Sequence, residues 1–192
     1  MNSRSCLSLS LAFALTLART AAADGVFWQV DIGADTRTLV AASRRGPWEY
    51  GLNISDYKGG RSGAINLAGV IALPGAVTLK AGPTLGWTRD DNGDGDTGLG
   101  ARIALDRWSA TSFGSTYVLA EASTPQRDWF LLAQVTLTAP AIGIELSRGG
   151  SETYHETTLA LQRRVGEGPW SLRLGYKLDS EELFAGFSIN TF

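Results

Sequence analysis

The stretch Trp170 to Asp179, WSLRLGYKLD, alternates apolar residues with polar or small residues at every position. A polar turn follows at Ser180 to Glu182, and Leu183 to Phe192 then runs as a second alternating segment that ends on an aromatic residue. Alternation with a period of two is typical of a β-strand, because successive side chains point to opposite faces. The stretch therefore predicts a β-hairpin with one apolar face and one polar face.

The same alternation continues through most of the chain and predicts twelve strands of about ten residues each. Residue arithmetic favours twelve over eight, because eight strands would leave about ten residues per connection. Ten strands is the alternative, since Arg37 to Arg45 alternates poorly. Pro83 lies inside the fifth segment and predicts a bulge or a break in the ladder there. The predicted strands begin near Phe27, Arg37, Trp48, Ala64, Val77, Leu99, Phe113, Trp129, Ile142, Thr157, Trp170 and Leu183.

Met1 to Ala23 predicts a secretory signal peptide, with a basic residue, an apolar run and a small-residue cleavage site. A mature chain from residue 24 to 192 is long enough for a single domain. The single cysteine, Cys6, lies in the predicted signal peptide. The mature chain is therefore expected to have neither disulfides nor thiol chemistry. Its 15 basic residues (17 minus two in the signal) oppose 19 acidic ones, and no basic cluster indicates a nucleic-acid partner.

After the predicted signal peptide there is no apolar run of 18 residues, so a membrane-spanning form of this chain needs closed β-structure. An alternating strand that runs to a terminal Phe resembles the closing strand of bacterial outer-membrane β-barrels. The resemblance implies an all-β, up-and-down antiparallel transmembrane barrel in the outer membrane of a Gram-negative bacterium. Its partners would be the lipid bilayer and the barrel-assembly machinery. The chain departs from the class at Phe192, which shares the phase of Ser188 and Asn190 instead of the apolar row.

Connections and tryptophans fit the same interpretation. Tight turns such as Gly46-Pro47 and Pro74-Gly75 fall at one end, while Lys58 to Gly63, Asp90 to Gly98 and Gly149 to Glu152 predict longer loops at the other. The six tryptophans fall near strand ends and predict two aromatic girdles at the membrane interfaces. They are Trp28, Trp48, Trp108 and Trp170 at the terminal side, and Trp87 and Trp129 at the opposite side.

Strand phase also predicts which polar residues face the barrel interior. Buried charges need water or an ion-pair partner, so this interior is expected to be wet or crossed by salt bridges. A solvated structural wall and a narrow channel for small solutes both fit, and five basic residues would bias a channel toward anions. The predicted lumen residues are Asp31, Glu49, Asn53, Lys80, Arg102, Gln134, Glu145, Gln162, Arg164, Arg173 and Lys177.

The segment Asp90 to Asp96 resembles the first half of a calcium loop. Oxygen-bearing side chains alternate at Asp90, Asn92, Asp94 and Asp96, with Gly95 among them. The twelfth position, which is a bidentate Glu in an EF-hand, is Ala101. A solvated polar loop and a structural calcium site therefore remain two hypotheses.

His155 is the single histidine and raises a third class of function. Outer-membrane phospholipases and lipid A deacylases place a His and a Ser at this height on the outer wall, so an outer-leaflet lipid hydrolase with His155 as general base is one alternative. The His-x-Ser-Asn-like segments of those families are absent here. A soluble secreted β-sandwich binding protein is a further alternative, because its core would also produce alternation.

Overall fold

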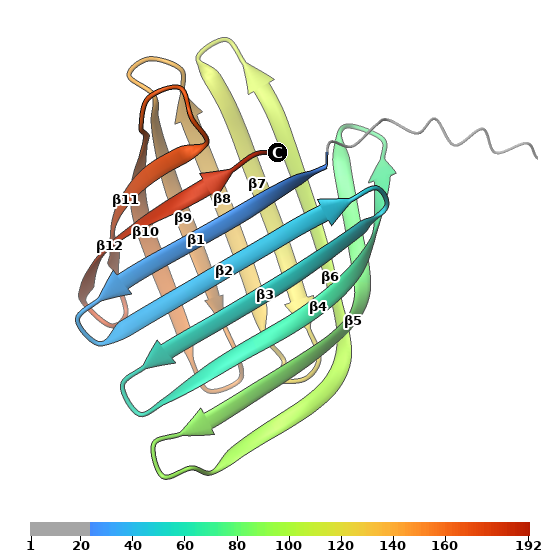
Figure 1. Cartoon of the computed structure of the whole chain (residues 1–192), viewed down its shortest axis with the longest axis vertical. Helices are drawn as coiled ribbons and strands as arrows, with labels where there is room; N and C mark the ends of the chain where they lie inside the picture. Colours follow the sequence, from blue (N-terminus) through green and yellow to red (C-terminus); the bar gives the residue numbers. More distant parts are fainter. Residues whose placement is uncertain (1–23) are drawn as a thin grey trace, which may run out of the picture.

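The computed structural model describes residues 24–192, so the predicted signal peptide at Met1 to Ala23 lies outside the described residues. Every strand pairs antiparallel with its sequence neighbours, and β1 pairs with β12, which closes the sheet into a barrel (Figure 1). This confirms twelve strands and excludes both ten strands and a two-sheet sandwich. The strands are β1 Gly25–Gly33, β2 Thr36–Arg45, β3 Trp48–Tyr57, β4 Gly60–Leu73, β5 Val77–Asp90, β6 Gly95–Thr111, β7 Gly114–Ser123, β8 Trp129–Leu137, β9 Ile142–Gly150, β10 His155–Arg164, β11 Trp170–Lys177 and β12 Glu182–Asn190.

An even number of antiparallel strands places the start of β1 and the end of β12 at the same end of the barrel, here named the terminal end (Figure 1). The opposite end is named the far end. The weakly alternating segment from Arg37 is a full strand, β2, paired along its length with β1 and β3. Within residues 24–192 there is no helix that is long and apolar enough to cross a membrane.

The predicted difference in loop length between the two ends was wrong. Connections span two to five residues at the terminal end (46–47, 74–76, 112–113, 138–141, 165–169) and also at the far end (34–35, 58–59, 91–94, 124–128, 151–154, 178–181). Most of the polar segments 58–63 and 90–98 extend β4, β5 and β6 instead of forming loops, and the bend expected at 109–111 belongs to β6. Backbone pairing in a long hairpin needs no apolar side chain, so composition alone did not reveal these extensions.

Pro83 interrupts the ladder as expected. The pairing of β4 with β5 passes from Asn66–Thr84 to Gly69–Ala81, and the residues between these two pairs are not paired across the two strands. On its other side Pro83 stays in register with Ala101 of β6. Proline has no backbone N–H to donate to a neighbouring strand, and this explains why the ladder to β4 is broken at Pro83.

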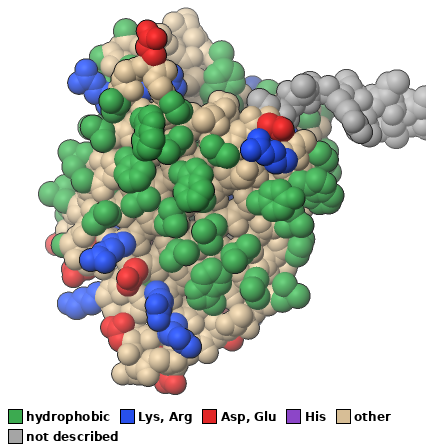
Figure 2. Space-filling view, viewed as in Figure 1, with side chains coloured by type: hydrophobic (Ala, Val, Ile, Leu, Met, Phe, Trp, Pro, Cys, Tyr) green, Lys and Arg blue, Asp and Glu red, His purple; other side chains and the backbone are tan. Residues whose placement is uncertain are grey.

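Burial is inverted relative to a water-soluble core. Among residues 24–192 the buried side chains include four apolar ones, Ala68, Ala104, Ala160 and Phe184, against nine polar or charged ones. Large apolar residues instead lie on the outer wall, where Leu174 is 58% exposed and Ile103 is 51% exposed. Figure 2 shows this wall as a broad band of hydrophobic side chains, with charged residues beyond both of its edges and most of them below it. The sheet is therefore apolar outside and polar inside.

Strand β7 reverses the expected phase. The sequence singles out Tyr117 and Leu119 as its apolar residues, yet Leu119 pairs with Asp106, which belongs to the inward row of β6. The small residues Val118 and Ala120 form the exposed row of β7. Side-chain size was a misleading guide here, because the outward row of β7 is apolar without being bulky.

The chain end packs back onto the first strand. The Thr191 N–H donates to the Val26 carbonyl at 3.0 Å, and the Val26 N–H donates to the Thr191 hydroxyl at 2.9 Å. The Phe192 ring lies over Gly25, where an added Cβ would come within 2.8 Å of it. Gly25 therefore provides the space that the out-of-phase aromatic residue requires.

Barrel closure predicts a specific cross-link. Ile32 of β1 faces Ala185 of β12 directly, so the pair Ile32→Cys with Ala185→Cys should form a disulfide on mild oxidation in detergent. The pair Ile32→Cys with Ile189→Cys is the control, because four residues of strand separate Ala185 from Ile189 by about 13 Å. Mobility on non-reducing gels reads out both pairs. Cross-linking of the control with equal yield would contradict the register.

Candidate functional site

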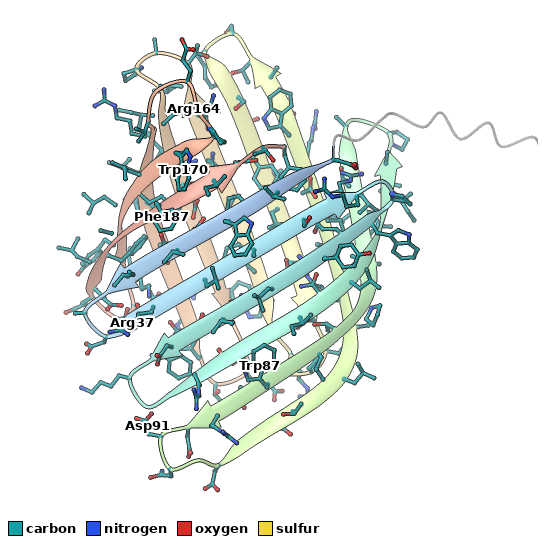
Figure 3. All side chains as sticks on the ribbon, viewed as in Figure 1. Arg37, Trp87, Asp91, Arg164, Trp170 and Phe187 are labelled. Carbon is teal, nitrogen blue, oxygen red and sulfur yellow. The ribbon has the colours of Figure 1, made fainter. Side chains whose placement is uncertain are left out.

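The barrel interior gathers most of the residues that strand phase selected. Asp31, Glu49, Glu145 and Arg173 are buried, each at 8% exposure or less. Lys80, Arg102 and Lys177 have side chains that are 13–15% exposed. Gln134 and Gln162 are half-buried, whereas Asn53 and Arg164 are exposed. Figure 3 shows Arg164 close to the terminal end, away from the paired charges described below.

Arg173 of β11 is the centre of a first cluster, named here the Arg173 cluster. Its Nε donates to Asp31 Oδ1 at 3.0 Å, and its Nη1 donates to Glu145 Oε2 at 3.0 Å. Nη1 also lies 3.4 Å from Gln162 Oε1. Asp31 comes from β1 and Glu145 from β9, so one guanidinium joins strands on both sides of its own. Its planar fork of donors is suited to two carboxylates at once.

A second cluster, named the Glu49 cluster, lies between β3 and β7. Lys80 Nζ is 2.8 Å from Glu49 Oε2 and 3.0 Å from Asp106 Oδ1. Arg102 Nε donates to Glu121 Oε1 at 2.6 Å, and Arg102 Nη1 lies 4.0 Å from Glu49 Oε1. Two cations thus share three carboxylates. Asp106 and Glu121 were not among the predicted lumen residues. Asp106 alternates strictly with Arg102 and could have been found from that pattern, whereas Glu121 lies on β7, whose phase the apolar residues suggested wrongly.

Two further missed carboxylates hold hairpin turns at the far end. Glu182 accepts hydrogen bonds from the N–H groups of Asp35 and Thr36 in the β1–β2 turn, and its partner Lys177 lies 3.4 Å away. Glu156 accepts from the N–H groups of Asp179 at 2.8 Å and Ser180 at 3.2 Å in the β11–β12 turn. These carboxylates replace strand partners that the turn N–H groups lack.

The acidic turn between β5 and β6 is tighter than a calcium loop. The Asp94 N–H donates to Asp90 Oδ1 at 2.8 Å, and the Thr97 N–H donates to Asp96 Oδ1 at 2.8 Å. In the part of the chain that the structure describes, no three His, Cys, Asp or Glu side chains converge as metal ligands. Calcium binding by Asp90, Asn92, Asp94 and Asp96 stays a prediction.

His155 has a carboxylate neighbour. Its Nε2 lies 3.5 Å from Asp179 Oδ1, and the imidazole is 58% exposed. Ser147 points inward and is buried, and within residues 24–192 no hydrogen bond joins His155 to a serine hydroxyl. A role of His155 as the general base of a hydrolase stays a prediction.

The tryptophans fall at two levels. Trp28, Trp48 and Trp170 lie on the outer wall toward the terminal end, each 45–50% exposed, and the Trp170 ring is 6.0 Å from that of Phe187. Trp87 lies toward the far end, as Figure 3 shows, and Trp129 begins β8 at that end. Trp108 differs, because it pairs with Tyr117 and continues the inward row of β6 at the terminal rim.

These features define a class: a closed twelve-stranded β-barrel with a charged interior and an apolar outer wall. No sequence profile of a known family matches the chain, and no curated protein matches it. Among solved structures it resembles the KdgM porin, at 11% identity and a TM-score of 0.53, over 88% of this chain and 99% of that one. A structure titled KdgM porin in complex with disordered oligogalacturonate matches with 12% identity, a TM-score of 0.52 and the same coverage. The likeness is one of fold.

Removing Arg173 should destabilise the barrel strongly. The Arg173→Met variant leaves Asp31 and Glu145 buried without a cation, which costs about 3–5 kcal/mol when one member of a buried ion pair is lost. The triple variant with Asp31→Asn and Glu145→Gln should recover most of that free energy of unfolding, because no buried charge remains. Urea unfolding in detergent micelles measures both. A triple variant as unstable as Arg173→Met would argue that the guanidinium acts through packing alone.

Acid should loosen the β11–β12 turn through Asp179. The Thr157 N–H donates to Asp179 Oδ2 at 2.7 Å, and this hydrogen bond lowers the pKa of the Asp179 carboxyl below its ordinary 3.8. A lowered pKa means that the contact stabilises the fold above pH 3.8 and is lost as the pH falls through the folded-state pKa. The Thr157 amide resonance in micelles should titrate with a midpoint below 3.8. The Thr157 N–H also donates to Glu156 Oε1 at 3.1 Å, so the component of the titration below 3.8 is the one assigned to Asp179. This component should vanish in Asp179→Asn and persist in Asp91→Asn, which removes a turn carboxylate elsewhere.

Proposed function

We propose that the chain is an integral outer-membrane β-barrel of a Gram-negative bacterium that acts as a narrow channel for small solutes. The observation that carries the proposal is the inversion of the sheet, with paired charges inside and large apolar side chains outside. Such a sheet buries its apolar surface only against hydrocarbon, and it leaves no unpaired strand edge there. Insertion by the barrel-assembly machinery follows as part of the proposal.

Two levels of tryptophan support the placement in a bilayer. Indole has an apolar body and one N–H donor, and it favours the headgroup zone. Trp48 and Trp170 begin strands at the terminal end, whereas Trp87 and Trp129 lie at the far end. The large exposed residues between these levels are aliphatic, for example Leu159 and Ile103. In this orientation the terminal end faces the periplasm.

The charges of the interior favour small solutes that are cationic or neutral, and this preference is expected to be weak. Four of the five basic residues expected to attract anions are already paired with carboxylates, and Arg164 is the one of these five without an ion pair to the described residues. The paired groups comprise four cations and six carboxylates, a difference of two negative charges. They are Lys80, Arg102, Arg173 and Lys177, against Asp31, Glu49, Asp106, Glu121, Glu145 and Glu182.

This charge balance argues against carrying over the ligand of the structural neighbour. The KdgM porin is seen with oligogalacturonate, an oligomer of carboxylate-bearing sugars. A lumen in which carboxylates outnumber cations would repel a polyanion rather than concentrate it. We therefore propose solutes that are smaller and not acidic, and we assign no specific molecule.

Single-channel recording in planar bilayers tests the proposal. The purified protein should give small discrete conductance steps, and a salt gradient should show a modest preference for K⁺ over Cl⁻. Glu121→Gln should shift the reversal potential toward anions, because Arg102 then loses its closest carboxylate. Asp56→Asn is the control with the same charge change on the outer wall. A protein that inserts but never conducts would refute the channel and leave a structural role.

A further inference from the structure

A row of three arginines and one aspartate crosses the outer wall at the far end. Arg37 of β2 pairs with Asp56 of β3, Asp56 pairs with Arg61 of β4, and Arg61 pairs with Arg89 of β5. Directly paired residues have their Cβ atoms about 4.5–5.5 Å apart on one face of a sheet. The four side chains, named here the arginine row, are all exposed. Figure 2 shows Lys and Arg gathered at this end below the hydrophobic band.

The arginine row has a shortage of negative charge. Among the described residues no carboxylate oxygen lies within 4.0 Å of the guanidinium nitrogens of Arg37, Arg61 or Arg89. The acidic residues of the neighbouring hairpin do not fill this role, because Asp90 and Asp96 share the inward phase of β5 and β6. Arg61 and Arg89 also face each other as like charges, which destabilises a sheet. The row therefore has an excess of positive charge that the protein leaves uncompensated.

A hollow in the surface accompanies the row. Its volume is about 560 Å³, and it is lined by Arg61 and Arg89 together with Trp87, Ile54 and the backbone near Gly95. The Trp87 ring covers Gly63 on the next strand, where an added Cβ would come within 2.2 Å of the ring. The hollow thus has cationic groups on one side and an apolar wall on the other.

We propose that the arginine row binds the phosphate of a lipid headgroup in the leaflet at the far end, with the acyl chains lying over Trp87 and Ile54. Guanidinium forks match phosphate oxygens in pairs, and such charge-assisted hydrogen bonds are strong. A lipid fits better than a free anion, because an apolar surface adjoins the arginine row. Ile54 and Trp87 each lie two residues along the strand from Asp56 and Arg89, on the same face, and they begin the apolar band. The inference rests on the bilayer placement proposed above and is independent of the channel.

Other outward arginines provide a matched control. Arg107 and Arg163 lie on the outer wall toward the terminal end, and their cross-strand partners are apolar: Val77 and Val118 for Arg107, Ile142 and Leu172 for Arg163. Neither has a second arginine opposite it. Replacing them removes the same charge without altering the arginine row.

Native mass spectrometry of the full mature chain in maltoside micelles tests the proposal. Short-chain phosphatidic acid should bind at least about tenfold more tightly than phosphatidylcholine of equal chain length, whose choline already neutralises the phosphate. Arg61→Gln with Arg89→Gln should reduce this preference to about twofold or less. Arg107→Gln with Arg163→Gln should retain it. Circular dichroism and heat-modifiable gel mobility confirm that each variant is folded.

Three outcomes would overturn the site. They are equal binding of the two lipids by the unaltered protein, a preference unchanged in the Arg61→Gln/Arg89→Gln variant, and complete displacement of the lipid by millimolar inorganic phosphate. The last result would assign the arginines to a free anion. Because binding is measured in micelles, loss of the lipid preference alongside normal conductance refutes the site alone, whereas retained lipid binding without conductance refutes only the channel.

Discussion

Backbone pairing around the whole circumference is the constraint on which everything else in this structure depends. The ladder between β1 and β12 runs from Phe27–Asn190 to Gly33–Phe184, and it removes the two edges that an open sheet would expose. Once the sheet is closed, each side chain faces either the lumen or the outside, and strand parity decides which. A polar lumen and an apolar wall then follow from alternation alone, without helices or a second sheet to cover either face.

The interior ion pairs depend on the closure of the barrel. Arg173 on β11 reaches Asp31 two strands away on β1 and Glu145 two strands away on β9. Lys80 on β5 likewise reaches Glu49 on β3. In a flat sheet, side chains two strands apart are separated by about 9–10 Å of strand spacing, and inward curvature brings long side chains together. The pairs therefore brace the curvature, and they narrow the lumen that any solute would have to cross.

Alternation predicted the architecture well, because each strand carries its own periodic signal. The eighth strand was predicted to begin near Trp129, which is the first residue of β8. The signal failed where polar hairpins project at 58–63 and 90–98, since their pairing is set by backbone geometry. It also failed on β7, where small residues face out. The ion-pair partners could not be predicted, because Glu49 and Arg102 lie 53 positions apart in sequence and meet only through curvature.

Strand parity gives the same residue type opposite roles on the two sides of the wall. Arg102 and Arg173 are inward, and each contacts two carboxylates. An unpaired charge inside the barrel would lose hydration without an ion pair to replace it. Arg61 and Arg89 are outward and face each other, and neither guanidinium has a carboxylate oxygen of the described residues within 4.0 Å, although Asp56 lies opposite Arg61 on the other side. Two like charges directly opposite each other destabilise the sheet. Water can solvate those two guanidinium groups, yet water does not explain why they adjoin a hollow walled by Trp87. A phosphate at that place would remove the repulsion, and the apolar wall would hold the chains attached to it.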